Sequence, residues 1–213
     1  MTDNLVAIIR NRHALTALDA EEYSEMKVSG MKFTISAFHA EGLGHVSVMN
    51  AKGFFGLMKM ETLIIVPDEE DRPLFSYDLI NAMGNMTLYL EMYDTVAGVY
   101  DASPLDALKE KYSSIPDHDP GKHWYDDIRL KESIYKKDRK NALIPSLAEE
   151  FLKTYIESPA SKTEERKLKK TKTKAYVDGL ISHGGPSTDV FKKNVGEEKT
   201  KDLFEKVLFG TAL

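Results

Sequence analysis

Residues 32–66, KFTISAFHAEGLGHVSVMNAKGFFGLMKMETLIIV, decide the fold. Apolar and polar side chains alternate over 32–39 and again over 45–50, the period-two pattern of strands with one buried face. A third, longer strand is predicted over 54–66, and it ends at Pro67. Short glycine-containing turns separate the three segments, as in hairpins. The stretch therefore predicts an antiparallel meander.

The segments on either side of the meander extend the same plan. Helical spacing of apolar residues predicts a helix over 3–28. Further strands are expected over 74–82, 86–93 and 127–136. They make 32–136 a sheet region of about six strands, and 145–209 follows as a helical half. This order predicts a single α/β domain over 1–213, with helices on both faces of an antiparallel sheet.

Composition narrows the kind of protein. The chain has 213 residues, of which 42% are hydrophobic and 30% charged, so we expect one globular domain with a core of normal size. It has no cysteine, which excludes disulfides and cysteine-ligated metal clusters. The net charge of −5 argues against nucleic acid as a partner.

No segment has the features of a membrane span or an export signal. No apolar run approaches the roughly 18 residues that a membrane helix needs. The apolar run near the N-terminus is short and precedes Arg10 and Arg12, which reverses the order of charge and apolar blocks in signal peptides. The sequence therefore predicts a cytoplasmic protein without a membrane partner.

The common catalytic and cofactor motifs are missing from the sequence. It contains no GxGxxG turn, no Walker loop, no HExxH zinc motif and no GxSxG nucleophile elbow. The histidines lack paired metal-ligand spacing, which favours surface or strand positions over a role as metal ligands. They are His13, His39, His45, His118, His123 and His183. We expect neither a metal nor a bound cofactor.

Asp78 is the most informative acidic residue. In the strand pattern LFSYDLI, it lies on the opposite face from Tyr77 and on the same face as Ser76 and Ile80. If that face is covered, partial desolvation raises the pKa of the carboxyl toward neutrality and suits it to proton donation. The alternative is an aspartate on an edge strand, in contact with water.

The strongest charge feature is the segment KTEERKLKKTKTK at 162–174. One interpretation is a solvated helix face, which is the usual place for such a run. The other is a docking surface for an acidic protein or ligand. The sequence leaves both open.

Several segments follow one another in a recognisable order. They are VP at 66–67, PLFSYDLI at 73–80, LYLEMYD at 88–94, HWYDDI at 123–128, EFLKTY at 150–155, AYV at 175–177, GP at 185–186, FKKNVGEE at 191–198 and FEKVLF at 204–209. This ordered set, spread over roughly residues 45–209, resembles the ferredoxin-dependent bilin reductases and their relative, the red chlorophyll catabolite reductase. The chain looks like a divergent member.

The resemblance implies a three-layer α/β/α sandwich with a tetrapyrrole pocket between the sheet and the C-terminal helices. Members of that family carry no cofactor of their own, and single electrons arrive from ferredoxin or flavodoxin. A carboxylic acid in the pocket protonates an open-chain tetrapyrrole, which then accepts an electron more readily. Asp78 falls at the position of the family's catalytic aspartate on the central strand.

Other family positions hold different residues in this chain. Thr62 stands where members that form phycocyanobilin have a histidine, and a family glutamate falls near Met49 or Asn50. Ser76 replaces the usual glycine, and a second family aspartate falls at Gly185. The resemblance therefore implies a substrate-binding set of Asn50, Thr62, Ser76 and, as the titratable residue nearest to Gly185, His183.

Two functions follow from these observations. The first is a reductase of a linear tetrapyrrole, with Asp78 as proton donor and an acidic electron-transfer protein docked on the basic segment. The lysines expected to dock the donor are Lys169, Lys170 and Lys172. The alternative is a ligand-binding domain that keeps the fold and has lost the catalytic set. The visible spectrum of the protein mixed with biliverdin would distinguish them.

Overall fold

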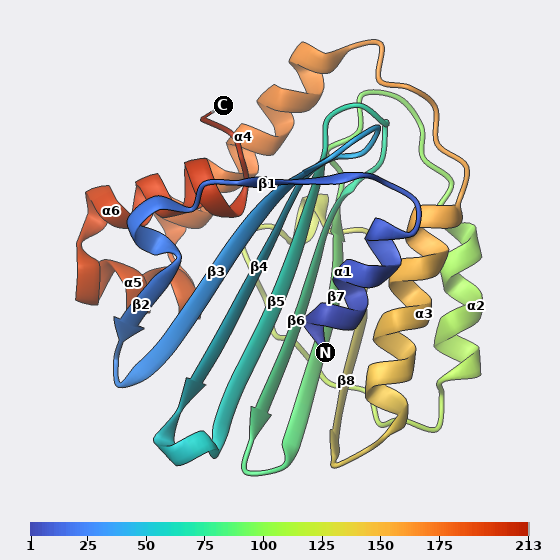
Figure 1. Cartoon of the computed structure of the whole chain (residues 1–213). Helices are drawn as coiled ribbons and strands as arrows, with labels where there is room; N and C mark the ends of the chain where they lie inside the picture. Colours follow the sequence, from blue (N-terminus) through green and yellow to red (C-terminus); the bar gives the residue numbers. More distant parts are fainter. Residues whose placement is uncertain (213) are drawn as a thin grey trace.

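Residues 1–212 are described in a computed structural model (Figure 1). They contain one eight-stranded sheet, in which neighbouring strands pair antiparallel. The strand order is β1-β3-β4-β5-β6-β7-β8, and β2 shares the outer edge of β3 with β1. The bounds are β1 Leu15–Leu18, β2 Glu25–Val28, β3 Met31–Ala40, β4 Gly44–Gly53, β5 Met58–Pro67, β6 Leu74–Ala82, β7 Asn85–Tyr93 and β8 Ile134–Arg139.

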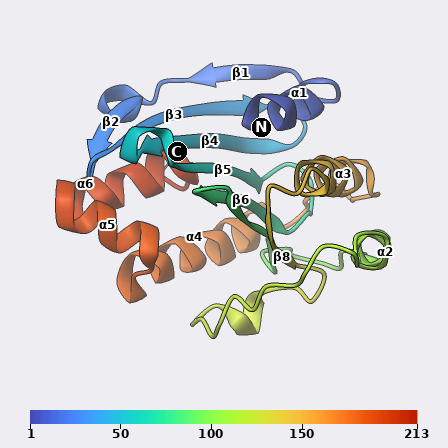
Figure 2. The ribbon, with the colours of Figure 1, turned by 90° about the horizontal axis from the view of Figure 1, so that it is seen from below.

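Helices cover both faces of the sheet (Figure 2). One layer consists of α1 Thr2–Arg10, α2 Ser103–Lys111 and α3 Leu143–Glu157. The other consists of α4 Arg166–His183, α5 Pro186–Val195, α6 Glu197–Asp202 and the π-helical turn η4 Leu203–Leu208. Short 3₁₀ turns lie at η1 Glu21–Tyr23, η2 Phe54–Gly56 and η3 Asp126–Ile128. The expected three-layer α/β/α sandwich is confirmed.

Each helical layer packs on its own apolar core. Phe75 and Tyr77 of β6 contact the α1–α3 layer, where Phe151 of α3 stacks on Phe75 at 5.7 Å between ring centroids. Phe33 of β3 faces the α4–α6 layer and packs edge-on against Phe191 at 5.1 Å. The period of two along each strand divides its side chains between these cores.

The predicted helix over 3–28 is wrong beyond its first third. The helix α1 ends at Arg10, and the chain then forms the two short strands β1 and β2. The helical spacing of Leu5 and Ile9 is real, because both side chains are fully buried. The later residues instead lie along an edge of the sheet, where pairing with β3 satisfies their backbone N–H and C=O groups.

Other boundaries also differ from the prediction. The strand expected over 127–136 is confined to β8, because residues 126–128 form a 3₁₀ turn instead. The strand expected from residue 54 begins at Met58, after the turn η2. The sheet therefore has two more strands than the six expected, both at the β3 edge. No helix within residues 1–212 is long and apolar enough to cross a membrane.

Residues 70–72 connect the two helical layers. The guanidinium of Arg72 donates hydrogen bonds to the carbonyl oxygens of Tyr155 and Ser158, at the end of α3. From the other layer, the Nζ of Lys169 on α4 donates to the carbonyl oxygen of Arg72 and lies 3.8 Å from the Asp71 carboxylate. Contacts of this loop therefore link α3 in one helical layer to α4 in the other.

Candidate active site between the sheet and the C-terminal helices

Asp78 lies on β6, on the face that the C-terminal helices cover. Thr62 of β5 is its direct cross-strand partner, and the Thr62 hydroxyl donates a hydrogen bond of 2.5 Å to Oδ1 of Asp78. The Ser76 hydroxyl donates to Oδ2 at 3.2 Å. Tyr77 points into the opposite core, as the alternation predicts. The sheet therefore presents one carboxyl group with two hydroxyl donors.

These three side chains open into a cavity of about 190 Å³. Aromatic rings from the rest of the chain form much of its wall, and the glycines at the end of α4 form part of its rim. The aromatic and glycine residues are Tyr93, Trp124, Tyr125, Tyr176, Phe204, Phe209, Gly184 and Gly185. Asp78 is partly accessible, and it lines this cavity. We refer to it as the Asp78 cavity.

The surroundings of Asp78 raise its pKa to about 6. Burial is the largest cause, because it penalises the charged carboxylate. The hydrogen bonds from Thr62 and Ser76 lower the pKa, and the nearby charge of Glu91 raises it. An acid with a pKa near 6 holds its proton on a fraction of molecules at neutral pH, which suits it to general acid catalysis.

Glu91 is a second acid in the wall of this cavity, and the sequence did not reveal it. Its side chain is buried and accepts hydrogen bonds from Tyr93 at 2.8 Å and from Tyr135 at 2.9 Å. The guanidinium of Arg129 lies 3.6 Å from it. Glu91 lies directly opposite Ser76 in the register of β6 and β7. The sequence alone does not give this register, so it could not place Glu91 in the site.

The structure brings together only part of the predicted substrate-binding set. Thr62 and Ser76 line the Asp78 cavity. Asn50 lies on the other face of β4, where it accepts a hydrogen bond of 3.0 Å from the Thr2 hydroxyl, so its assignment is wrong. Its neighbour Met49 faces the cavity instead, because a shift of one residue changes the face. His183 is exposed and does not line the cavity.

His183 lies just outside the site. Its ring stacks on Trp124, with 5.0 Å between ring centroids, and the chain then turns at Gly184 into α5. Trp124 in turn packs against Gly179 of α4, where an added Cβ would lie 2.2 Å from the indole. The histidine thus covers the outer side of a tryptophan that lines the cavity.

The three lysines predicted to dock an electron donor have different environments. Lys169 is only 1% exposed, and burial lowers its pKa to about 8. This excludes Lys169 from any docking surface, because its ammonium is held by Arg72 and Asp71 inside the protein. Lys172 is half-buried and donates to the Val96 carbonyl at 2.7 Å. Lys170 is the one of the three that is exposed.

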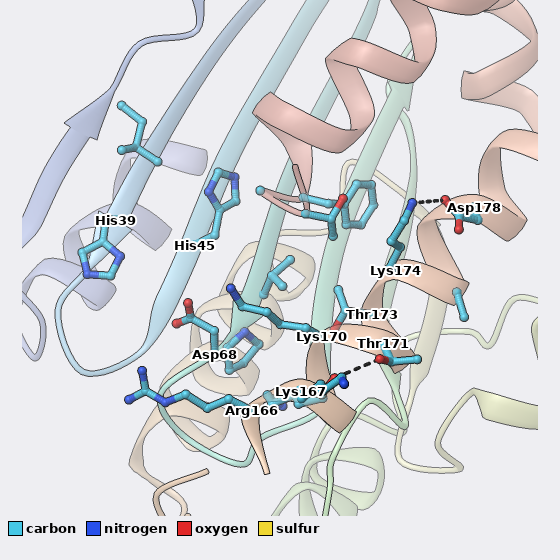
Figure 3. A pocket seen from close by; sticks show the side chains of 18 residues that line it. His39, His45, Asp68, Arg166, Lys167, Lys170, Thr171, Thr173, Lys174 and Asp178 are labelled. Atoms are coloured by element: carbon cyan, nitrogen blue, oxygen red, sulfur yellow. Dashed lines mark hydrogen bonds and ion pairs between the residues drawn. The ribbon is translucent and has the colours of Figure 1, made fainter. Parts of the chain in front are cut away.

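A larger cavity of about 890 Å³ lies along α4 (Figure 3). The only residue that lines both is Phe209, among those the structure describes. Apolar side chains form part of its wall, namely Leu18, Val66, Pro67, Ala175 and Phe209. Basic side chains of α4 line another part, and we therefore refer to it as the basic cavity.

Three of the basic side chains that line the basic cavity form no ion pair within residues 1–212. They are Arg166, Lys167 and Lys170. The ion pairs of α4 are formed by other lysines of the helix. In Figure 3, Arg166 and Lys170 extend toward Asp68 and the strand ends. The basic cavity has the size usual for small-molecule sites, about 300–1,000 Å³. An organic anion with an apolar body matches this lining.

Comparison with known proteins supports the fold and goes no further. No protein-family model and no curated protein sequence matches the chain. A solved structure that is similar is phytochromobilin synthase from tomato, in complex with biliverdin, with a TM-score of 0.73. The match covers 99% of this chain and 83% of that one at 15% sequence identity. At this identity the likeness shows a shared fold.

Proposed function

We propose that this chain reduces a linear tetrapyrrole, or a similarly conjugated ligand, with Asp78 as proton donor. The observation that carries the proposal is the Asp78 carboxyl, with a pKa of about 6, in a cavity between the sheet and the C-terminal helices. The fold shared with a protein that was solved with biliverdin supports this class of ligand. Asp78 gives its proton to the ligand and recovers one from solvent.

The reduction of one double bond consumes two electrons and two protons. We assign the electrons to an external single-electron donor, ferredoxin or flavodoxin, as the family resemblance implies. The second proton comes from solvent. Lys170 is the exposed member of the three lysines predicted to dock the donor, but its position in the wall of the basic cavity favours a contact with the ligand instead.

The two cavities suggest how the ligand lies. The Asp78 cavity, at about 190 Å³, is below the usual range for small-molecule sites, and the basic cavity is within that range. We place the carboxylates of the ligand against Arg166 and Lys170, and its rings in the basic cavity. The ring that is reduced lies toward Asp78, past Phe209, which lines both cavities.

The experiment replaces Asp78 with asparagine. Asp78→Asn keeps the shape of the side chain and removes the acid. The variant should still bind biliverdin, seen as a change in the visible spectrum, and should reduce it at least ~10²-fold more slowly with a chemically reduced ferredoxin. The matched control is Asp106→Asn on α2, in the other helical layer. Reduction at the wild-type rate by Asp78→Asn would contradict the proposal.

A ligand-binding domain without catalysis is the second candidate. The observation that favours it is that this chain has no titratable side chain at three positions where the resembling family has one. In this chain they are Thr62, Asn50 and Gly185. If the wild-type protein binds biliverdin and leaves it unreduced with either donor, this candidate replaces the first.

A further inference from the structure

The hairpin end of the sheet exposes large apolar side chains. In the turn between β4 and β5, Phe55 is fully exposed, Phe54 is 60% exposed and Leu57 is exposed too. Met83, in the turn between β6 and β7, is 69% exposed. The two turns are in contact, because the Met83 N–H donates a hydrogen bond of 2.8 Å to the Leu57 carbonyl oxygen. These four side chains project from one end of the sheet.

The backbone at these positions is strained. Phe54, Phe55 and Met83 have φ values of 51°, 56° and 52°, in the left-handed region that bulky residues rarely adopt. Glycine or asparagine would occupy the same turns with less strain. Strained bulky residues that contact little else in the protein point to a role outside it.

A row of lysines runs beside these turns. On four neighbouring strands, the residues directly opposite one another are Lys27, Lys32, Lys52 and Lys59. All four are exposed, and within residues 1–212 only Lys32 of the four has an ion pair, with Glu25 at 2.9 Å. Like charges directly opposite one another destabilise a sheet. The row therefore adds a second feature that folding alone does not explain.

This end of the molecule differs in charge from the whole. The chain has a net charge of −5, yet the lysine row is joined by the exposed Arg139 and Lys140 at the end of β8. The Lys140 N–H donates to the carbonyl of Gly84, which places it at the β6–β7 turn. In Figure 1 the β4–β5 and β6–β7 turns lie at the lower end of the sheet.

We propose that the hairpin end docks on the surface of an anionic lipid bilayer. Phe54, Phe55, Leu57 and Met83 enter the interface between headgroups and acyl chains, and the lysines bind the anionic headgroups. The apolar side chains project separately from two turns. A bilayer interface accommodates such separate projections, whereas a protein partner would need a matching pocket for each. This contact is peripheral, so it requires no membrane-spanning segment.

The test is co-sedimentation with vesicles of two compositions. The wild-type chain should bind vesicles of equimolar phosphatidylcholine and phosphatidylglycerol, and should not bind vesicles of phosphatidylcholine alone. Added salt should weaken the binding. Equal binding to both vesicles, or binding to neither, would overturn the proposal.

Two variants test the residues without threatening the fold. Phe55→Asn places a residue that tolerates positive φ at a fully exposed position, so the protein should fold at least as well. Lys52→Glu creates favourable cross-strand pairs with Lys32 and Lys59. Each should weaken binding to the mixed vesicles by about 10-fold or more.

Matched controls carry the same changes elsewhere on the surface. Val99→Asn replaces an exposed apolar residue, and Lys131→Glu replaces an exposed lysine, both remote from the hairpin end. Neither should alter vesicle binding. If all four variants bind alike, the assignment is wrong. If the wild type dimerises in solution through Phe55, or binds acidic proteins through Lys52 and ignores vesicles, the occupant is a protein and the lipid proposal fails.

Discussion

The chemistry proposed for this chain depends on the protonation of one carboxyl group. Four influences act on Asp78, and they do not all act in one direction. Burial and the charge of Glu91 raise its pKa, whereas hydrogen bonds from Thr62 and Ser76 lower it. The Thr62 hydroxyl thus opposes the effect of burial by stabilising the charged carboxylate. The side chain can both hold and release a proton near pH 6.

The raised pKa has a consequence for stability. In the unfolded chain an aspartic acid titrates near 3.8, and in the folded protein the pKa of Asp78 is about 6. Between these values the folded state binds more protons than the unfolded state, so the free energy of unfolding falls as pH rises. The two-unit difference corresponds to at most about 3 kcal/mol. In Asp78→Asn the free energy of unfolding should not show this fall as pH rises.

Urea denaturation at several pH values from about 4 to 7 measures the effect as the difference between wild type and variant. At pH 7 Asp78→Asn should be the more stable of the two, since it buries no charge. The control Asp106→Asn should follow the wild-type curve. A variant curve parallel to that of wild type over the whole range would show that the carboxyl is not desolvated.

Some residues of the candidate site were predicted correctly from the sequence and others wrongly, each for a physical reason. Alternation along β6 placed Asp78 and Ser76 on the cavity face, because strand side chains have a strict period of two. The prediction for Asn50 was wrong by one position, because neighbouring residues of a strand point to opposite faces of the sheet. The prediction for Lys169 was wrong because lysines are usually exposed, and the burial of this one depends on Asp71, which is distant in the sequence.

At the scale of elements, α4 is the helix common to both cavities. Its first turns carry the free basic residues of the basic cavity, and Tyr176 and Leu180 line the Asp78 cavity. A helix rotates by about 100° per residue. Lys169 therefore points into the protein, and its neighbour Lys170 points into the basic cavity and solvent.

Two roles for Lys170 lead to different kinetics. If it binds a carboxylate of the ligand, Lys170→Glu should weaken biliverdin binding about 10-fold and leave the rate at saturating biliverdin unchanged. If it docks the donor instead, the dependence on ferredoxin concentration should change, and biliverdin binding should not. We expect the first result, because the side chain lies in the cavity wall.

Spectroscopic titration with biliverdin and steady-state rates at varied ferredoxin concentration measure the two effects separately. The matched control is Lys153→Glu, an exposed lysine on α3 in the other layer. A change in neither quantity would remove Lys170 from both roles. A similar change with Lys153→Glu would indicate a general effect of net charge.

The elements that the sequence predicted best were those with long, regular alternation. The meander of β3, β4 and β5 has strands of ten residues each, and all three strands were predicted in the right order. The bounds of β3 were right to one residue, whereas β5 begins four residues later than expected. The strands β1 and β2 have four residues each and were assigned to a helix. So short a segment has almost no periodic signal, and its structure comes from pairing with β3.

At the scale of the whole molecule, the loop at 70–72 holds the two helical layers together. Asp71→Ala would leave the ammonium of Lys169 buried without its nearest carboxylate. Breaking a buried pair in this way costs about 3–5 kcal/mol. We expect the free energy of unfolding to fall by this amount, with both layers lost in one transition.

Urea denaturation followed by far-UV circular dichroism and by the fluorescence of Trp124 checks this, because the tryptophan reports on the α4 layer alone. The control is Asp94→Ala, which removes the partner of the half-exposed Lys172 at 3.3 Å. That pair should contribute no more than about 1 kcal/mol. Equal losses for the two variants would show that Asp71 has no special role.

The strand β4 is held on both faces by segments distant in the chain. Asn50 accepts a hydrogen bond from Thr2, 48 residues away, and Ser47 donates one of 2.7 Å to the Leu208 carbonyl, 161 residues away. A ribosome adds about 5–20 residues per second, so roughly 8–30 s separate the synthesis of Ser47 from that of Leu208. The turn η4 is therefore made long after the strand that it covers, and the apolar side chains beneath it are covered only when synthesis is nearly complete.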